Sequence, residues 1–149
     1  MNAVVDEGVL KPQSATAEPV YFQSGAYRLF GWLHKPAGDS STPLGLVICK
    51  PFGFEAMSAH LTMRVQAEMA AGLGIPTLRF DYAGTGDSED LAPAADQLDA
   101  WVQDVIAAIQ ELQRRTGVQR VCLLGIRLGG LLATLAASRC AQVDRKSVV

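Results

Sequence analysis

From residue 118 the sequence runs Val118-Gln119-Arg120-Val121-Cys122-Leu123-Leu124, then Gly125-Ile126-Arg127-Leu128-Gly129, then Gly130-Leu131-Leu132-Ala133-Thr134-Leu135-Ala136. The first seven residues are largely apolar and predict a buried strand. The last seven combine small and apolar side chains and predict a helix. The pentapeptide between them has a glycine at each end. This succession predicts a tight turn that joins a strand to the helix that follows it.

The turn has the layout of a nucleophile elbow, the G-x-S-x-G turn that raises a serine hydroxyl above a parallel sheet. Gly125 and Gly129 permit the strained backbone and the close approach of helix to sheet, because a side chain at either position would collide with its neighbours. The central residue here is Arg127. A guanidinium stays protonated in proteins and cannot attack a carbonyl carbon. The sequence therefore predicts the architecture of an elbow without its nucleophile.

Strand and helix patterns alternate before this turn. Strands are predicted at 20–23, 27–33, 44–49 and 76–80, and helices at 58–73 and 96–116. The first two strands flank Ser24-Gly25-Ala26 and predict a hairpin. The alternation from Leu44 onward implies parallel strands with right-handed crossovers. The expected fold class is α/β, a mostly parallel sheet with an N-terminal antiparallel hairpin and flanking helices.

Apolar side chains at helical spacing define the two predicted helices. The first carries Leu61, Val65 and Met69. The second carries a longer apolar stripe, made of Leu98, Trp101, Val102, Val105, Ile106, Ile109 and Leu112.

The composition of the 149-residue chain fits one globular domain, with 49% hydrophobic residues and a net charge of -2. This charge gives no reason to expect a nucleic-acid partner or an acidic membrane. Residues 1–20 contain acidic residues and a lysine, unlike a secretory signal. The three cysteines are an odd number without C-x-x-C spacing, which argues against a disulfide framework and a zinc site. We expect a cytoplasmic protein with no metal and no cofactor.

Two further stretches occupy the order expected of one superfamily. They are Lys50-Pro51-Phe52-Gly53-Phe54-Glu55 and Arg79-Phe80-Asp81-Tyr82-Ala83-Gly84-Thr85-Gly86-Asp87-Ser88. Together with the elbow they resemble the alpha/beta-hydrolase superfamily, in its serine aminopeptidase-like branch. The combination is similar to a subgroup near the exosortase A system-associated hydrolases, in which an arginine can occupy the elbow centre. The resemblance covers most of residues 44–137.

The resemblance implies roles for backbone groups and for the missing triad. It implies an oxyanion hole built from the loop of Phe52 and Gly53 and from the N–H of Leu128. In the superfamily the acid and the histidine follow the nucleophile along the chain. We therefore expect a partial fold: a flexible leader at 1–19, and at 20–149 the N-terminal half of a hydrolase domain, truncated at the start of the strand after the elbow helix. Arg145 and Lys146 interrupt the apolar run that a central strand would need there.

The loop from Asp81 to Ser88 could be mistaken for a phosphate-binding loop. It lacks the lysine of a Walker sequence, and a glutamate stands where a third glycine would complete G-x-G-x-x-G. We expect Asp81, Asp87 and Ser88 to tie the loop to neighbouring backbone, around the turns made by Gly84 and Gly86.

The remaining candidates are two histidines and Arg127 itself. His34 ends a hairpin strand and His60 lies near the start of a helix; both fit structural roles, and His60 is the weak catalytic candidate because it follows the oxyanion-type loop. Arg127 has two open interpretations. Its charge is held by a nearby carboxylate or by solvent, or it joins the helix N-terminus in an anion site.

These observations lead to two principal functional expectations. The first is a relative of hydrolases of ester, thioester or peptide-type acyl bonds that is inactive as this chain. The second is a non-catalytic binding module, in which Arg127, Leu128 and the loop at 50–54 hold an anionic small molecule or a partner chain. A gene remnant is a third reading. Because strand 118–124 would form an open sheet edge, we also expect self-association or pairing with a complementing C-terminal half.

Overall fold

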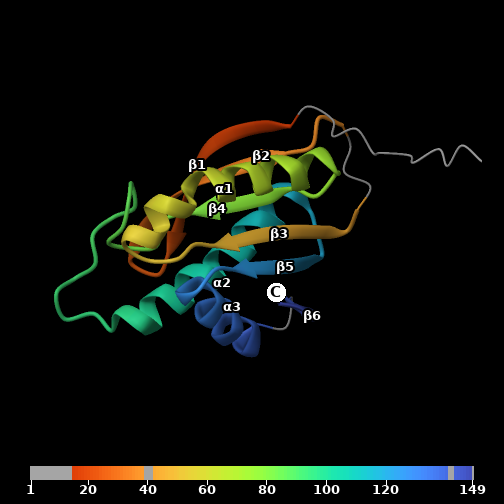
Figure 1. Cartoon of the computed structure of the whole chain (residues 1–149). Coiled ribbons are helices and arrows are strands. Elements are labelled where there is room, and N and C mark those ends of the chain that lie inside the picture. Colours follow the sequence, from red (N-terminus) through yellow and green to blue (C-terminus); the bar gives the residue numbers. More distant parts are fainter. Residues whose placement is uncertain (1–14, 39–41, 141–142, 149) are drawn as a thin grey trace, which may run out of the picture.

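The computed structural model describes residues 15–38, 42–140 and 143–148. Its elements are β1 (Thr16–Ser24), β2 (Tyr27–Lys35), β3 (Leu44–Cys49), α1 (Phe54–Gly72), β4 (Thr77–Phe80), α2 (Gln97–Thr116), β5 (Arg120–Gly125), α3 (Leu128–Arg139) and β6 (Val143–Val148), as Figure 1 shows. The strands form one sheet in the order β1-β2-β4-β3-β5-β6. β1, β2 and β4 pair antiparallel, whereas β4, β3, β5 and β6 are parallel. The predicted fold class is confirmed.

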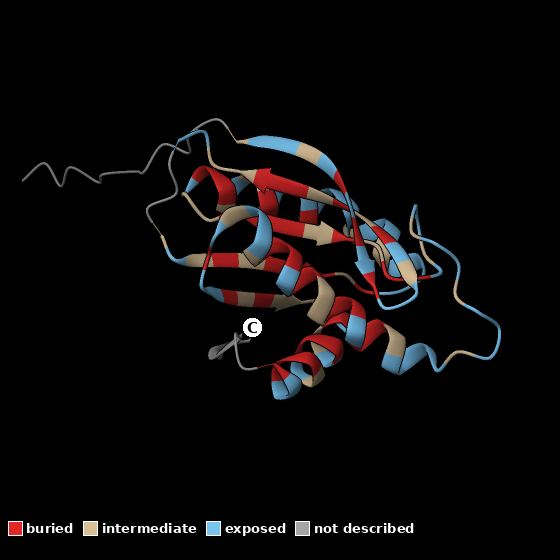
Figure 2. Ribbon diagram, turned by 180° about the vertical axis from the view of Figure 1, so that it is seen from behind, coloured by how far each residue is buried: buried red, intermediate tan, exposed pale blue. Residues whose placement is uncertain are grey.

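Helices α2 and α3 cover one face of the sheet and pack against each other. α2 begins after Asp96, whose side chain accepts a hydrogen bond from the Asp99 N–H (3.1 Å), and ends at Gly117, which has a φ of 75°. Its predicted stripe faces the sheet, except that Leu98 is half exposed. In Figure 2 the buried residues of these helices are the red segments of their ribbons.

Helix α1 lies alone on the opposite face, and the apolar residues that mark it in the sequence do not face the sheet. Leu61 and Met69 are 67% and 57% exposed. Met63, Ala67 and Ala71 are buried instead. Small alanine side chains let the helix approach the strands closely, so the larger apolar side chains turn outward. The helix also starts four residues earlier than its apolar pattern predicts.

The N-terminal hairpin is confirmed, with Gly25 at a φ of 55° in the turn between β1 and β2. The predicted leader at 1–19 is too long, because β1 begins at Thr16 and pairs there with Lys35. Residues 16–19 belong to the strand because they pair with β2 along its whole length, although no apolar pattern in the sequence marks them. The rest of the predicted leader, residues 1–14, lies outside the described residues.

The predicted open edge at strand 118–124 is also wrong. β6 pairs parallel with β5, with Val121 opposite Val143 and Leu123 opposite Val148 across an irregular register. Backbone hydrogen bonding thus forms a strand despite the interruption by Arg145 and Lys146, because ladder pairing does not require apolar side chains.

Candidate functional site

The elbow is the tight corner that the sequence predicts. β5 ends at Gly125, and α3 starts three residues later at Leu128. Arg127 lies between them at φ 53° and ψ -114°, and it is the only non-glycine residue with positive φ in the described part of the chain. The Gly129 N–H donates to the Ile126 carbonyl oxygen (2.9 Å), which closes the turn. The backbone therefore has the strained form that presents one side chain at the carboxyl edge of the sheet.

Close backbone contacts explain the two glycines of the elbow. A Cβ on Gly125 would collide with the backbone of Gly130, and a Cβ on Gly129 would collide with the carbonyl oxygen of Cys49. Position 130 is different, because the nearest atom to a Cβ there would be 3.6 Å away. Gly125 and Gly129 are required by packing between β3, β5 and α3.

The charge of Arg127 is held by a carboxylate. Its Nη1 lies 3.0 Å from Oε1 of Glu55 in the first turn of α1. The two side chains are 73% and 46% exposed, so water screens the pair and its contribution to stability is small. Of the two interpretations from sequence, this geometry matches the one in which a nearby carboxylate holds the guanidinium.

The loop after β3 lies against the elbow, as the oxyanion-hole prediction requires. The Ile126 N–H donates to the Cys49 carbonyl oxygen (3.2 Å), which brings this loop beside the start of α3 at Leu128. Phe52 is half exposed, and Gly53 has a φ of 65° just before α1. The oxyanion role of Phe52, Gly53 and Leu128 stays a prediction.

The loop after β4 is fastened by its own side chains. Asp81 accepts hydrogen bonds from the Lys50 ammonium (2.6 Å) and the Asp87 N–H (3.0 Å). The Ser88 hydroxyl donates to the Asp81 carbonyl oxygen (2.6 Å) and accepts from the Phe30 N–H (2.9 Å). The expected tying of the loop is therefore seen for Asp81 and Ser88, whereas Asp87 takes part through its backbone.

Gly84 and Gly86 provide the turns of this loop, with φ of 78° and 51°. A Cβ on Gly86 would also collide with the Asp81 carboxylate. On the inner side, the buried Asp104 of α2 accepts from the Ala83 N–H (2.8 Å), and the Trp101 indole N–H donates to the Ala83 carbonyl oxygen (2.9 Å). Burial raises the pKa of Asp104. Helix α2 thus holds the loop after β4 in place through its hydrogen bonds to the Ala83 backbone.

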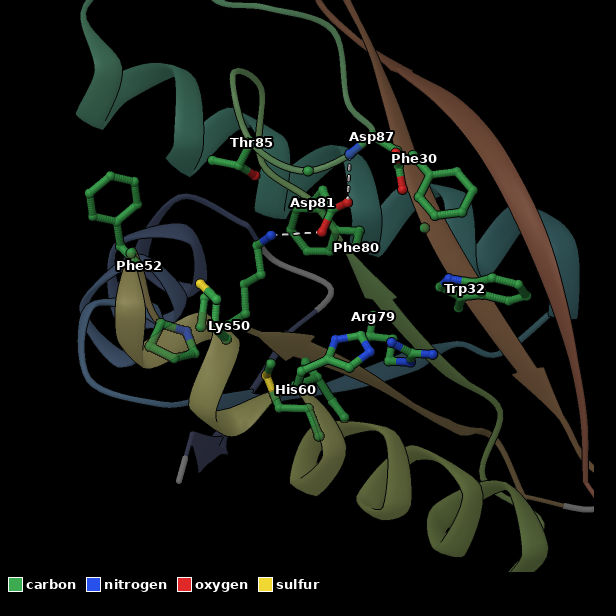
Figure 3. A pocket seen from close by; sticks show the side chains of 18 of the residues that line it. Phe30, Trp32, Lys50, Phe52, His60, Arg79, Phe80, Asp81, Thr85 and Asp87 are labelled. Atoms are coloured by element: carbon green, nitrogen blue, oxygen red, sulfur yellow. Dashed lines mark hydrogen bonds and ion pairs between the residues drawn. The ribbon is translucent and has the colours of Figure 1, made fainter.

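A pocket of about 610 Å³ opens between α1, β2, β4 and the loops after β3 and β4 (Figure 3). Its wall includes the weak catalytic candidate His60, together with Lys50, Phe52, Gly53 and Asp81. Arg127 is not part of this wall. The loop at 50–53 lines the pocket, whereas the elbow arginine points to Glu55. The binding module formed by Arg127, Leu128 and the loop at 50–54 stays a prediction.

Sequence reasoning missed a pair of basic side chains in this pocket region. Arg79 of β4 donates through Nε to Nε2 of His34 on β2 (3.0 Å). His34 is 1% exposed; burial first, and then the Arg79 charge, lowers its pKa to about 4. Burial also lowers the pKa of Arg79. A signal for this pair was available in the sequence, since polar residues stand at alternate positions of two apolar strands. In the sheet Trp32 pairs with Arg79 and His34 with Thr77, which makes Arg79 and His34 diagonal neighbours.

Burial also excludes the Cys49 thiol as a nucleophile. Cys49 at the end of β3 is fully buried, and desolvation raises the pKa of its thiol to about 12. Its sulfur stays protonated and out of reach of a ligand, so Cys49 acts as a small buried hydrophobe. In the described ranges, no helix is long and apolar enough to cross a membrane.

Comparison with known proteins gives a family and a fold. Residues 57–149 match the family model described as serine aminopeptidase, S33. No curated protein matches the chain. A hypothetical protein from Pseudomonas aeruginosa superposes with a TM-score of 0.73 at 23% identity, over 96% of this chain and 46% of that one. An esterase from Pyrococcus furiosus gives 0.69 at 18% identity, over 87% and 47% of the two chains.

A member of the a/b serine hydrolases without lid, from Xanthomonas campestris, gives a TM-score of 0.65 at 22% identity, over 87% of this chain and 58% of that one. These identities establish the shared fold alone. The chain spans about half the length of the solved structures that it matches.

Proposed function

The chain belongs to the serine aminopeptidase S33 family of alpha/beta hydrolases, and from this we propose that it keeps the hydrolase scaffold but does not cleave acyl bonds by itself. One observation carries the proposal. The elbow has its strained backbone, but its central side chain is a guanidinium paired with Glu55. A permanent cation cannot attack a carbonyl carbon. The whole protein's substrates would be esters, thioesters or peptide-type acyl compounds.

Other hydroxyl groups near the pocket are already engaged. The Ser88 hydroxyl is bound between Asp81 and Phe30, and the Thr85 hydroxyl donates to the Tyr82 carbonyl oxygen (2.8 Å). Neither contacts a histidine that could take its proton. This arrangement supports inactivity, because a serine or threonine nucleophile needs an adjacent base.

An ester assay tests the proposal. With p-nitrophenyl acetate we expect only the background rate from the purified chain. Arg127→Ser should stay inactive, because His34 is buried on β2 and His60 lies on α1, so a new hydroxyl would gain no triad. Turnover by the wild-type chain that disappears in Arg127→Ala or His60→Ala would overturn the proposal.

A second candidate function is a non-catalytic binding module for an anionic small molecule. The pocket favours it, because its wall combines apolar side chains with Lys50, His60 and Arg79. Anions that raise the melting temperature of the chain in proportion to their concentration would support this function. The absence of a shift with every carboxylate and phosphate tested would discard it.

We also propose that the isolated chain self-associates in the cytoplasm. The support comes from α1, where Phe54 and Leu61 are 79% and 67% exposed. Size-exclusion chromatography of Leu61→Gln should show less association than wild type. A wild-type chain that elutes as a monomer at every concentration would contradict this part. The cytoplasmic location rests on the sequence alone.

A further inference from the structure

Among the described side chains, no carboxylate forms an ion pair with Arg79 of the pocket wall, although the charges of Asp81 and Glu68 act on it from further away. Arg79 donates through Nε to His34, and no other described side chain accepts from its two terminal amino groups. Lys50, the other permanent cation of the wall, is neutralised by Asp81 at 2.6 Å. An unpaired guanidinium that is half-buried is costly to leave without an anion.

His34 holds this guanidinium in one orientation. Its Nε2 accepts the hydrogen bond from Arg79 Nε, so the ring is the neutral tautomer with its proton on Nδ1. Burial of His34 prevents it from adding a second positive charge. Since Nε is occupied, the pair of terminal amino groups stays available, and this is the edge that grips a carboxylate with two parallel hydrogen bonds.

Apolar walls lie beside the charge. The Trp32 ring centroid is 5.8 Å from the guanidinium carbon, and the Phe30 ring is edge-on to Trp32 at 5.8 Å. Met57 and Met63 of α1 line the opposite wall. Figure 3 shows Arg79 between Trp32 and His60. A ligand with an apolar body could pack on these side chains while its anionic end meets Arg79.

The far end of the pocket argues against ligands with several negative charges. The exposed Asp87 and the Lys50–Asp81 pair lie there, on the loops after β4 and β3. A second anionic group would meet the Asp87 carboxylate instead of a free cation. This arrangement favours a monoanion over a phosphate ester or a dicarboxylate.

We propose that Arg79 is the anion-binding residue of the pocket and that the pocket takes organic monocarboxylates with an aromatic or similarly flat apolar body. The proposal rests on the binding-module function and gives it a ligand class. Arg79 is the binding residue, and His34 is a positioning residue that acts through it.

The test compares 2-naphthoate with 2-naphthamide, which have the same shape but differ in charge, by calorimetric titration of the whole chain. We expect wild type to prefer the carboxylate by at least about tenfold. Arg79→Gln should remove this preference, whereas Arg79→Lys should keep a few-fold part of it, because lysine retains the charge and loses the fork. Arg139→Gln is the matched control: it removes the same charge from α3, but Arg139 is paired with Asp99 (2.9 Å) and does not line the pocket.

Two outcomes would overturn the proposal: equal binding of both compounds by wild type, or a preference that survives in Arg79→Gln. The second outcome would overturn the role of Arg79 but not the proposed binding of anions by the pocket. Ester turnover would overturn inactivity alone. If circular dichroism shows that Arg79→Gln does not fold, the Arg79 Nε–H resonance of wild type decides, because it should shift with naphthoate and stay in place with naphthamide.

Discussion

The two faces of the sheet are built in different ways. On one face α2 and α3 close a large buried cluster that includes Ile109, Leu112 and Leu132. On the other face α1 alone packs against β4, β2 and β3 and buries only a small cluster of Ile48, Met63 and Ala67. The first face holds the domain together, whereas the second has room for a pocket with charged side chains. The face covered by α2 and α3 thus provides most of the buried core, and the face covered by α1 provides the pocket.

The largest expected change in stability comes from a substitution in the elbow, where the start of α3 packs against the end of β3. Gly129→Ala would force a methyl group into the Cys49 carbonyl oxygen, and both backbones are fixed. We expect a loss of more than about 4 kcal/mol, which unfolds a marginally stable domain. Gly130→Ala, with 3.6 Å of clearance, should fold normally. Circular dichroism of the two variants checks this; a native spectrum and wild-type melting for Gly129→Ala would contradict it.

The same truncation on the two faces should differ sharply. Leu132→Ala on α3 removes a fully buried side chain and should cost about 3–4 kcal/mol in the free energy of unfolding. Leu61→Ala on α1 removes a side chain that is 67% exposed and should change it by less than about 0.5 kcal/mol. Urea denaturation at low protein concentration, where the proposed self-association is weakest, measures both. Equal losses there would contradict the difference between the two faces.

Acid should lower the free energy of unfolding, because the buried His34 resists protonation in the folded chain. Its folded pKa is about 4, against an ordinary value of 6.5, so between these values the unfolded chain takes up a proton that the folded chain does not. Stability is therefore full above pH 6.5 and falls as the pH drops to 4, by roughly 3.4 kcal/mol at most. His34→Gln should flatten this dependence. Urea midpoints measured from pH 4 to pH 7 decide, and parallel curves for wild type and His34→Gln would contradict the assignment.

The smallest effect concerns the strain at position 127. Glycine tolerates a φ of 53°, whereas alanine keeps the strain and loses the Glu55 pair. Arg127→Gly should therefore be more stable than Arg127→Ala by about 1 kcal/mol. Urea midpoints of the two variants give the difference. If alanine were the more stable residue, the corner in solution would not have the positive φ.

Local chemistry made much of the fold predictable. The Gly125 and Gly129 pair, the hairpin turn at Gly25 and the α2 stripe each follow from neighbours in sequence, because turn geometry and helical periodicity act over a few residues. The candidate site was less accessible. The loops at 50–53 and 81–88 could be located, but the pocket itself needed Arg79 and His34, which are 45 residues apart.

The sequence by itself determined an elbow whose attacking atom is replaced by a guanidinium, since the identity of residue 127 excludes a nucleophile in any environment. Only the tertiary structure decided that Arg127 pairs with Glu55, that α1 turns its larger apolar side chains outward, and that β6 covers β5. The reason is that helix rotation, strand order and ion pairing are set by competition for burial among segments distant along the chain. No local pattern records the outcome of that competition.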